Sequence, residues 1–267
     1  MTRLRAADLA RLVREKLVRP LLPHGVTAGL NRNDRIGAFH RAWGHVFTNH
    51  LRGAYYEFGV YFGEGFRASH QVHTFFTRWL QRQLGADEPW RRDVAKQYAD
   101  FTPHFYAFDT FQGMPEHAED NDVLGPGHFR CSLEEFARLN RKAGLIEGPA
   151  VRYFVGTFQQ ILRRDADVLA GLQPAAVVNI DCDLYASARD ALEIVGSKLM
   201  QGSVLLVDDW NIFAADPEKG ERRALREFLA SHPAFSFEPW FSYEYAGQAF
   251  LVHRNGIAGD AISPDVH

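Results

Sequence analysis

From residue 54 onward, short runs of apolar residues alternate with longer segments in which apolar positions recur every three or four residues. Each short run is apolar at nearly every position, which is typical of strands buried on both faces of a parallel sheet. The longer segments have the period of amphipathic helices. The five runs are AYYEFGV (54–60), HFYAFD (104–109), VRYFV (151–155), AAVVNID (175–181) and SVLLVDD (203–209).

A helical segment follows each run, beginning near residues 65, 132, 158, 185 and 217. This alternation predicts an α/β fold with a doubly wound, mostly parallel sheet. The sequence SLEE predicts a capping box, with Ser132 at the N-cap and Glu135 reaching back. Residues 110–131 form a long polar segment of the kind that often closes over a binding site.

The two ends of the chain have different patterns. The first ~50 residues read as helices, with a break at Pro20 and Pro23 and a second apolar periodicity from Ile36 to Leu51. Residues 235–254 read as two strands joined by a turn at Ala246 and Gly247. We therefore expect an N-terminal helical extension or lid over 1–52, a main domain over 53–255 and a flexible tail over 256–267.

Composition narrows the classes of partner. The formal net charge of −3 gives no support for nucleic acid or an anionic membrane as the main partner. Two cysteines are too few for a disulfide framework, which favours a reducing compartment. The sequence has no secretory h-region and no apolar run of about 20 residues, the length that spans a membrane. We expect a cytoplasmic protein.

Carboxylates stand at the ends of two predicted strands. Asp181 and Asp183 follow one strand, and Asp208 and Asp209 end the next. Because adjacent strands lie about 4.8 Å apart, we expect Asp181, Asp208 and Asp209 to converge. Three carboxylates would repel one another without a cation, and an all-oxygen set points to Mg²⁺, with Mn²⁺ or Ca²⁺ as alternatives. Structural roles, such as a helix cap or a turn, would explain one carboxylate each.

The other strand ends also carry candidate binding residues, since ligands of open parallel sheets bind beyond the carboxyl ends of the strands. The first turn, EFGVYFGEG, departs from the dinucleotide spacing G-x-G-x-x-G and could be only a tight connection. Asp109 could accept from both ribose hydroxyls of a nucleoside or close an Asx-turn. Gly156 and Phe158 could flank an adenine ring, or Phe158 could belong to the core.

Histidines and aromatic residues are less specific signals. His40, His45 or His50 could supply a base from the N-terminal helices, although a structural role is the simpler interpretation for each. His70 and His73 lack a third partner, so surface positions are favoured over a zinc site. The aromatic group at Trp240, Phe241, Tyr243 and Tyr245 suits sugar stacking, yet aromatic residues are also ordinary strand formers.

Several motifs in order resemble the macrocin O-methyltransferase (TylF-type) family over about residues 35–254. They are E-x-G-V-x-x-G, FDTFQGMP, G-x-F at Gly127 and Gly156, IDCDLYASARDAL and GSVLLVDDW. The resemblance implies an enzyme that uses S-adenosylmethionine and a divalent metal to methylate sugar hydroxyls of natural products. It also implies a class I, Rossmann-like fold with a seven-stranded sheet, an N-terminal helical extension and an antiparallel C-terminal strand.

The resemblance further implies roles for single residues. Asp181 and Asp183 would be catalytic, with Asp183 as a candidate base, and Asp181, Asp208 and Asp209 would bind the metal. The cofactor would contact Glu57, Gly59, Gly63, Asp109, Thr110, Gly156 and Phe158. Three departures bear on the acceptor: Gly65 replaces a common serine, Trp210 replaces the usual tyrosine, and the usual Cys before the last helix is missing.

The implied mechanism has the metal ion acting as a Lewis acid on the acceptor hydroxyl while Asp183 or an N-terminal histidine takes the proton. The acceptor would be a small molecule, and the N-terminal helices could join subunits into a homo-oligomer. Other functions stay open: a glycosyltransferase that holds a nucleotide-sugar metal with its D-x-D, or an S-adenosylmethionine-binding scaffold without turnover. A metal-dependent hydroxylase fits less well, because histidine ligands for iron would be expected.

Overall fold

The computed structural model describes residues 33–116 and 125–255. The predicted first helix, the tail over 256–267 and residues 117–124 of the long polar segment lie outside the described residues.

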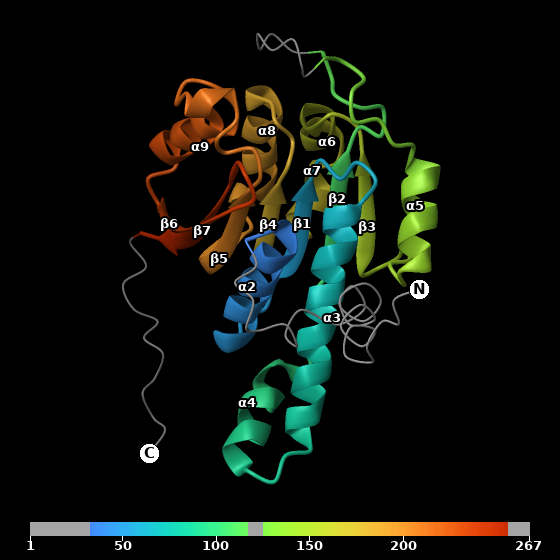
Figure 1. Cartoon of the computed structure of the whole chain (residues 1–267), viewed down its shortest axis with the longest axis vertical. Helices are drawn as coiled ribbons and strands as arrows, with labels where there is room; N and C mark the ends of the chain where they lie inside the picture. The colour runs from blue at the N-terminus through green and yellow to red at the C-terminus, as the bar shows by residue number, and fades with distance from the viewer. Residues whose placement is uncertain (1–32, 117–124, 256–267) are drawn as a thin grey trace, which may run out of the picture.

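A seven-stranded sheet forms the centre of the molecule, in the order β3-β2-β1-β4-β5-β7-β6 (Figure 1). The first five strands are parallel to one another, and β7 pairs antiparallel with both β5 and β6. The five predicted strands, the C-terminal hairpin and the antiparallel C-terminal strand are confirmed. The strands are β1 (Ala54–Phe58), β2 (Phe105–Asp109), β3 (Val151–Val155), β4 (Ala175–Ile180), β5 (Leu199–Val207), β6 (Phe235–Tyr243) and β7 (Gly247–Arg254).

Helices cover both faces of the sheet (Figure 1). Residues of β1 and β4 are buried without interruption because alternate side chains enter two separate cores, which explains the unbroken apolar runs in the sequence. One core packs under α2 (Arg35–Thr48), α3 (Glu64–Leu84), α4 (Pro89–Ala99) and α5 (Leu133–Lys142). The other packs under α6 (Phe158–Arg164), α7 (Ala166–Ala170), α8 (Tyr185–Gly196) and α9 (Gly220–Ser231).

Helix α2 belongs to the same core as the sheet. Its residues Phe39, Ala42 and Val46 are fully buried, and the Nε1 of the buried Trp43 donates to Ser69 Oγ of α3 at 2.9 Å. The predicted helix from Ile36 is thus confirmed, but it ends at Thr48, before Leu51. The division of the chain into an extension and a main domain stays a prediction, but this helix packs as an integral layer.

Two helices and one helix cap differ from the sequence prediction. The apolar pattern predicted neither α4 nor α7; α4 buries only Ala95 and Tyr98, so its sequence carries little periodicity. Ser132 Oγ caps α5 by accepting from the backbone N–H of Glu135 at 3.2 Å, but the Glu135 carboxylate pairs with Arg138 at 2.6 Å. The predicted capping box is therefore half formed.

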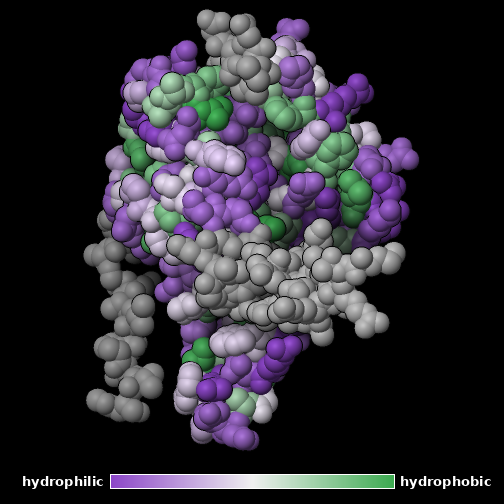
Figure 2. Space-filling view, viewed as in Figure 1, coloured by the Kyte–Doolittle hydropathy of each residue, from purple (hydrophilic) through white to green (hydrophobic). Residues whose placement is uncertain are grey.

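The surface is mainly polar on the face drawn in Figure 2, with apolar residues in small separate patches. Beyond the end of the sheet, α3 continues as a projecting arm that carries α4 (Figure 1). No helix in the described ranges is both long enough and apolar enough to cross a membrane.

Hydrogen bonds align the residues that follow three adjacent strands. Gly59 N donates to Phe108 O, Asp181 N to Phe58 O and Asp208 N to Ile180 O, each at 2.9 Å. The carboxyl ends of β1, β4 and β5 are thereby held level. Gly59 adopts a φ of 82°, and a Cβ at this position would lie 1.9 Å from Asp181 O. Only glycine fits this close approach.

We expect Gly59→Ala to lower the free energy of unfolding by about 3 kcal/mol or more, since left-handed strain adds to a backbone overlap. Gly144→Ala is the matched control, because Gly144 has a φ of 81° but open space where a Cβ would stand. The control should lose only about 1–2 kcal/mol. Urea unfolding measures both losses, and equal values would show that the close approach to Asp181 imposes no constraint.

Candidate active site

A cavity of about 580 Å³ opens at the carboxyl edge of the parallel strands. Its volume lies within the range of small-molecule sites, roughly 300–1,000 Å³. Gly63 and Gly156, which were also predicted to bind a ligand, shape adjoining turns instead of lining the cavity. The predicted residues that do line it are Glu57, Gly59, Asp109, Thr110, Phe158, Asp181, Asp183, Asp208 and Asp209.

Glu57 is a buried carboxyl group beneath the cavity. It is only 1% exposed, and its Oε2 accepts from the hydroxyl of Tyr55 at 2.5 Å. Burial raises the pKa of Glu57 to about 8. The helix α3 comes so close that a Cβ on Gly65 would lie 2.6 Å from Glu57 Oε1. A side chain at position 65 would therefore require the Glu57 carboxyl group to move.

Asp109 fastens the first turn to the end of β2. Its Oδ2 accepts from the backbone N–H groups of Val60 at 2.8 Å and Tyr61 at 3.3 Å, and its Oδ1 accepts from Phe111 N at 2.7 Å. The bond to Phe111 is the Asx-turn that the sequence left open. Burial raises the pKa of Asp109, while these three N–H donors act in the opposite direction. The ribose-binding role stays a prediction.

The turn after β3 places Phe158 both in the core and at the border of the cavity. Thr157 and Gln160 form a complete capping box at the start of α6, and Gly156 N donates to Asp109 O at 3.0 Å. The ring of Phe158 packs edge-on against Phe58, with centroids 5.4 Å apart. Phe158 is thus mainly a core residue whose remaining surface borders the cavity.

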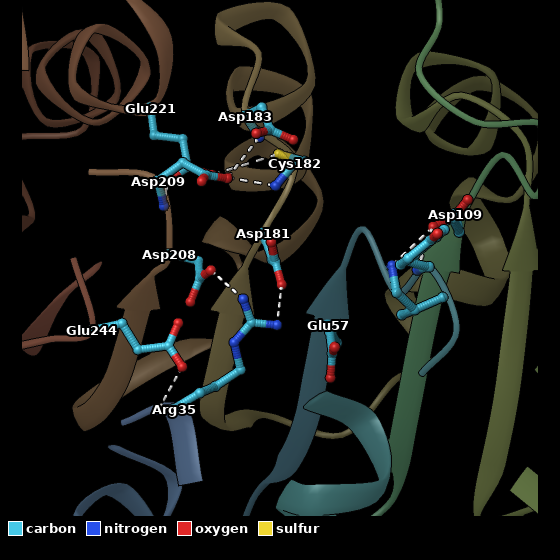
Figure 3. A network of polar contacts seen from close by, with 12 residues as sticks. Arg35, Glu57, Asp109, Asp181, Cys182, Asp183, Asp208, Asp209, Glu221 and Glu244 are labelled. Carbon is cyan, nitrogen blue, oxygen red and sulfur yellow. Dashed lines mark hydrogen bonds and ion pairs between the residues drawn. The ribbon is translucent and has the colours of Figure 1, made fainter. Parts of the chain in front are cut away.

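The four aspartates do not converge on one point (Figure 3). Consecutive residues of an extended chain point to opposite sides, so Asp208 and Asp209 face different layers. Asp209 Oδ2 accepts from Asp183 N at 3.2 Å, and Asp209 N donates to Glu221 Oε2 at 3.0 Å. The carboxylates of Asp181 and Asp208 lie on the same side and face each other. Across residues 33–116 and 125–255, no group of three His, Cys, Asp or Glu side chains is arranged to hold a metal ion.

Arg35 joins the two carboxylates that do face each other, a contact that the sequence did not reveal (Figure 3). Its Nη1 lies 2.9 Å from Asp181 Oδ2, and its Nη2 bonds to Asp208 Oδ2. Its backbone N–H donates to Glu244 Oε1 at 2.9 Å. Arg35 is the first residue of α2, where the helix dipole favours acidic residues. An arginine at this electrostatically unfavourable position is the sequence feature that could have pointed to a contact with acidic residues.

The cluster carries more negative than positive charge. Burial raises the pKa values of Asp181, Asp209 and Glu221, and repulsion between neighbouring carboxylates adds to this effect. Burial also raises the pKa of Asp208, whereas Arg35 lowers it. The oxygen-rich set has the chemistry that Mg²⁺ prefers. Its present arrangement does not fit a metal ion, because Arg35 fills the space between Asp181 and Asp208 and Asp209 faces away.

None of the histidines proposed as a base lines the cavity. His45 Nε2 instead pairs with Gly202 O at 3.0 Å, and His40 packs against Phe76. The prediction of surface positions for His70 and His73 is wrong: both are partly buried in ring contacts with Phe105. The four aromatic residues predicted as a sugar-stacking group, Trp240, Phe241, Tyr243 and Tyr245, also lie outside the cavity lining.

Comparisons with known proteins relate this chain to methyltransferases. A family model described as Macrocin-O-methyltransferase (TylF) matches residues 92–233, more than half of the chain. A curated protein of Streptomyces olivaceus, described as 8-demethyl-8-(2,3-dimethoxy-alpha-L-rhamnosyl)-tetracenomycin-C 4'-O-methyltransferase, is 30% identical over 140 residues. That alignment covers 49% of this chain and 51% of the relative, so the chain matches about half of the relative's length.

Solved structures share the fold at lower identity. The calicheamicin methyltransferase CalS11 has a TM-score of 0.58 at 18% identity, with 96% of this chain and 95% of that chain covered. The O-methyltransferase NovP has a TM-score of 0.57 at 20% identity, with 81% and 78% covered. At such identities the similarity establishes the fold alone, and it agrees with the class I architecture expected from the sequence.

The raised pKa of Glu57 predicts a pH dependence of stability. A carboxyl group with a raised pKa in the folded state binds its proton more tightly there, so its contribution is present below the unfolded pKa near 4.5 and is lost as the pH rises through about 8. As the pH rises from about 5 to about 8, the free energy of unfolding should therefore fall less in Glu57→Gln than in the wild type. The difference between the two decreases should be up to a few kcal/mol.

Urea unfolding at several pH values measures this difference. Other buried carboxyl groups contribute to both proteins, so the comparison isolates Glu57. Glu135→Gln, at a surface position on α5, should keep the wild-type slope. An identical pH slope in Glu57→Gln and the wild type would contradict a raised pKa at Glu57.

Proposed function

The chain belongs to the macrocin O-methyltransferase (TylF) family, and from this premise we propose that it transfers the methyl group of S-adenosylmethionine to a hydroxyl group of a sugar or glycosylated natural product. The observation that carries the proposal is the cavity into which adjacent strand ends deliver Glu57, Asp109 and Asp181. The curated Streptomyces olivaceus relative, described as a 4'-O-methyltransferase of a rhamnosyl compound, supports the sugar acceptor.

The cofactor would lie along the ends of β1, β2 and β3. Glu57 offers a carboxyl group to the amino group of the methionine part, close to the turn at Gly59 and Gly63. A carboxylate has about four lone-pair positions, and three backbone N–H groups already bond to Asp109. The Thr110 hydroxyl also acts on this carboxyl group, so a ribose hydroxyl would share Asp109 with these partners. Thr110 and the exposed part of Phe158 would border the ribose and adenine.

Asp183 is the proposed general base. It lines the cavity beside Asp181, at the turn between β4 and α8. In the transfer, an acceptor oxygen would form a bond to the methyl carbon while the carbon–sulfur bond breaks and its electron pair stays on sulfur. The acceptor proton would pass to Asp183. Alignment of oxygen, carbon and sulfur in the cavity would supply the entropic share of the rate enhancement.

Magnesium at Asp181, Asp208 and Asp209 stays a prediction from the sequence. The oxygen donors suit it, but Arg35 lies between two of the three carboxylates, and no step of the proposed transfer is assigned to a metal ion. The cytoplasmic location and a homo-oligomer formed through N-terminal helices likewise stay predictions.

Calorimetric titration of S-adenosylhomocysteine tests the cofactor. We expect measurable binding to the wild type and at least tenfold weaker binding to Asp109→Asn, because one acceptor oxygen of the anchoring carboxylate is lost. Asp93→Asn, on the surface of α4, should bind like the wild type. Absence of binding to the wild type would contradict the methyltransferase proposal, and binding of a nucleotide-sugar in its place would favour a glycosyltransferase.

Substitution of the base tests the chemistry. Asp183 has a φ of 59°, and asparagine tolerates that conformation, so Asp183→Asn should keep the fold and the affinity for S-adenosylhomocysteine. Methyl transfer should fall by about 10²–10⁴, the usual contribution of a general base. The measurement is the rate of S-adenosylhomocysteine release with rhamnosylated acceptors, and an unchanged rate would remove Asp183 from this role.

A further inference from the structure

The guanidinium of Arg35 stands where the sequence predicts a metal ion. Its two terminal nitrogens each contact a different carboxylate, Asp181 from the end of β4 and Asp208 from the end of β5. All three side chains border the cavity, and the Arg35 side chain is 30% exposed. The position is therefore occupied by a cation that belongs to the chain and can be reached from solvent.

The contact leaves part of the cluster unsatisfied. Asp208 Oδ1 is buried and makes no hydrogen bond of ordinary geometry in the described structure, and the nearby Tyr243 hydroxyl, which lowers the pKa of Asp208, is its weak neighbour. An unpaired buried carboxylate oxygen is costly. Because the guanidinium divides its nitrogens between two carboxylates, it does not form the bidentate pair that gives arginine its strongest contact. The oxygens thus retain unused capacity for a cation.

The backbone around Arg35 is held by bonds that do not involve its guanidinium. Arg35 N donates to Glu244 Oε1 at 2.9 Å, and Glu244 N donates to Asn33 O at 2.6 Å. Asp34 caps α2 by accepting from Gly37 N at 2.8 Å. The side chain could therefore leave the carboxylates while the start of α2 stays in place.

We propose that Arg35 is the resident cation of this site and competes with a divalent metal ion for Asp181 and Asp208. A divalent ion bound beside the guanidinium would be repelled by it, so Arg35 weakens binding of such an ion to these carboxylates. The wild type would bind a divalent ion weakly and keep its structure without one. Loss of the Arg35 charge would turn the same carboxylates into a stronger metal site.

This inference concerns control of the proposed methyltransferase site and rests on that function for its catalytic meaning. Metal binding itself can be measured without turnover. Titration of S-adenosylhomocysteine into the same samples separates the two proposals. A wild type that does not bind this molecule contradicts the methyltransferase, whereas the metal comparison between variants still tests Arg35.

The test is Mn²⁺ binding to the full chain, followed by the electron paramagnetic resonance signal of the free ion. We expect Arg35→Gln to bind Mn²⁺ at least tenfold more tightly than the wild type. Arg52→Gln is the matched control, because it removes an arginine that pairs with Asp100 at the surface, and it should behave like the wild type. Equal affinity of Arg35→Gln and the wild type, or no binding by either, would overturn the proposal.

Thermal unfolding gives a second measurement. Without metal, Arg35→Gln should have a lower Tm, since Asp181 and Asp208 lose their counter-charge. Mg²⁺ should raise its Tm more than that of the wild type, as expected for a ligand that binds the folded state. If Arg35→Gln does not fold, Arg35→Met decides the matter. Methionine keeps much of the apolar part of the side chain but has no charge, so the Mn²⁺ affinity of this variant should also exceed that of the wild type; an equal affinity would contradict the proposal.

Discussion

The compensation of buried carboxylates is the constraint around which the site is built. Asp181 and Asp208 are held level by the hydrogen bonds that continue the sheet, so their charges must be balanced where the strands end. Arg35 supplies that balance from the start of α2. The position of α2 over β4 and β5, its burial in the core and its anchorage to Glu244 are consistent with this single requirement.

The alternation of side chains along β5 divides the acidic residues into two groups. Asp208 joins Asp181 and Arg35 on the α2 side, while Asp209 joins Asp183 and Glu221 on the side of α8 and α9 (Figure 3). The first group contains the cation Arg35. In the second group, the carboxylates of Asp209 and Glu221 accept hydrogen bonds from backbone N–H groups. The proposed base, Asp183, therefore belongs to the group on the side of α8 and α9, in which burial and repulsion raise the pKa values of the neighbouring Asp209 and Glu221.

The cofactor half of the cavity depends on backbone approach more than on charge. Gly59 and Gly65 leave room for Asp181 O and the Glu57 carboxylate, and Asp109 fixes the intervening turn through N–H groups. A Cβ at Gly59 would overlap the backbone of Asp181, and a Cβ at Gly65 would displace the Glu57 carboxyl group. The cavity thus has one rigid wall of backbone and one wall of acidic side chains balanced by Arg35.

The sequence alone determined the sheet, its hairpin and the strand ends that carry acidic residues, because burial on two faces leaves a period that can be read locally. It determined neither α4, whose few buried residues leave little pattern, nor the cation of the site. Arg35 meets Asp208 across a separation of 173 residues, and the Asp209 carboxylate accepts from Asp183 N instead of binding the predicted ion. Periodicity records which face of a strand is buried, whereas the partner of a buried charge is chosen by helix packing, which only the tertiary structure decides.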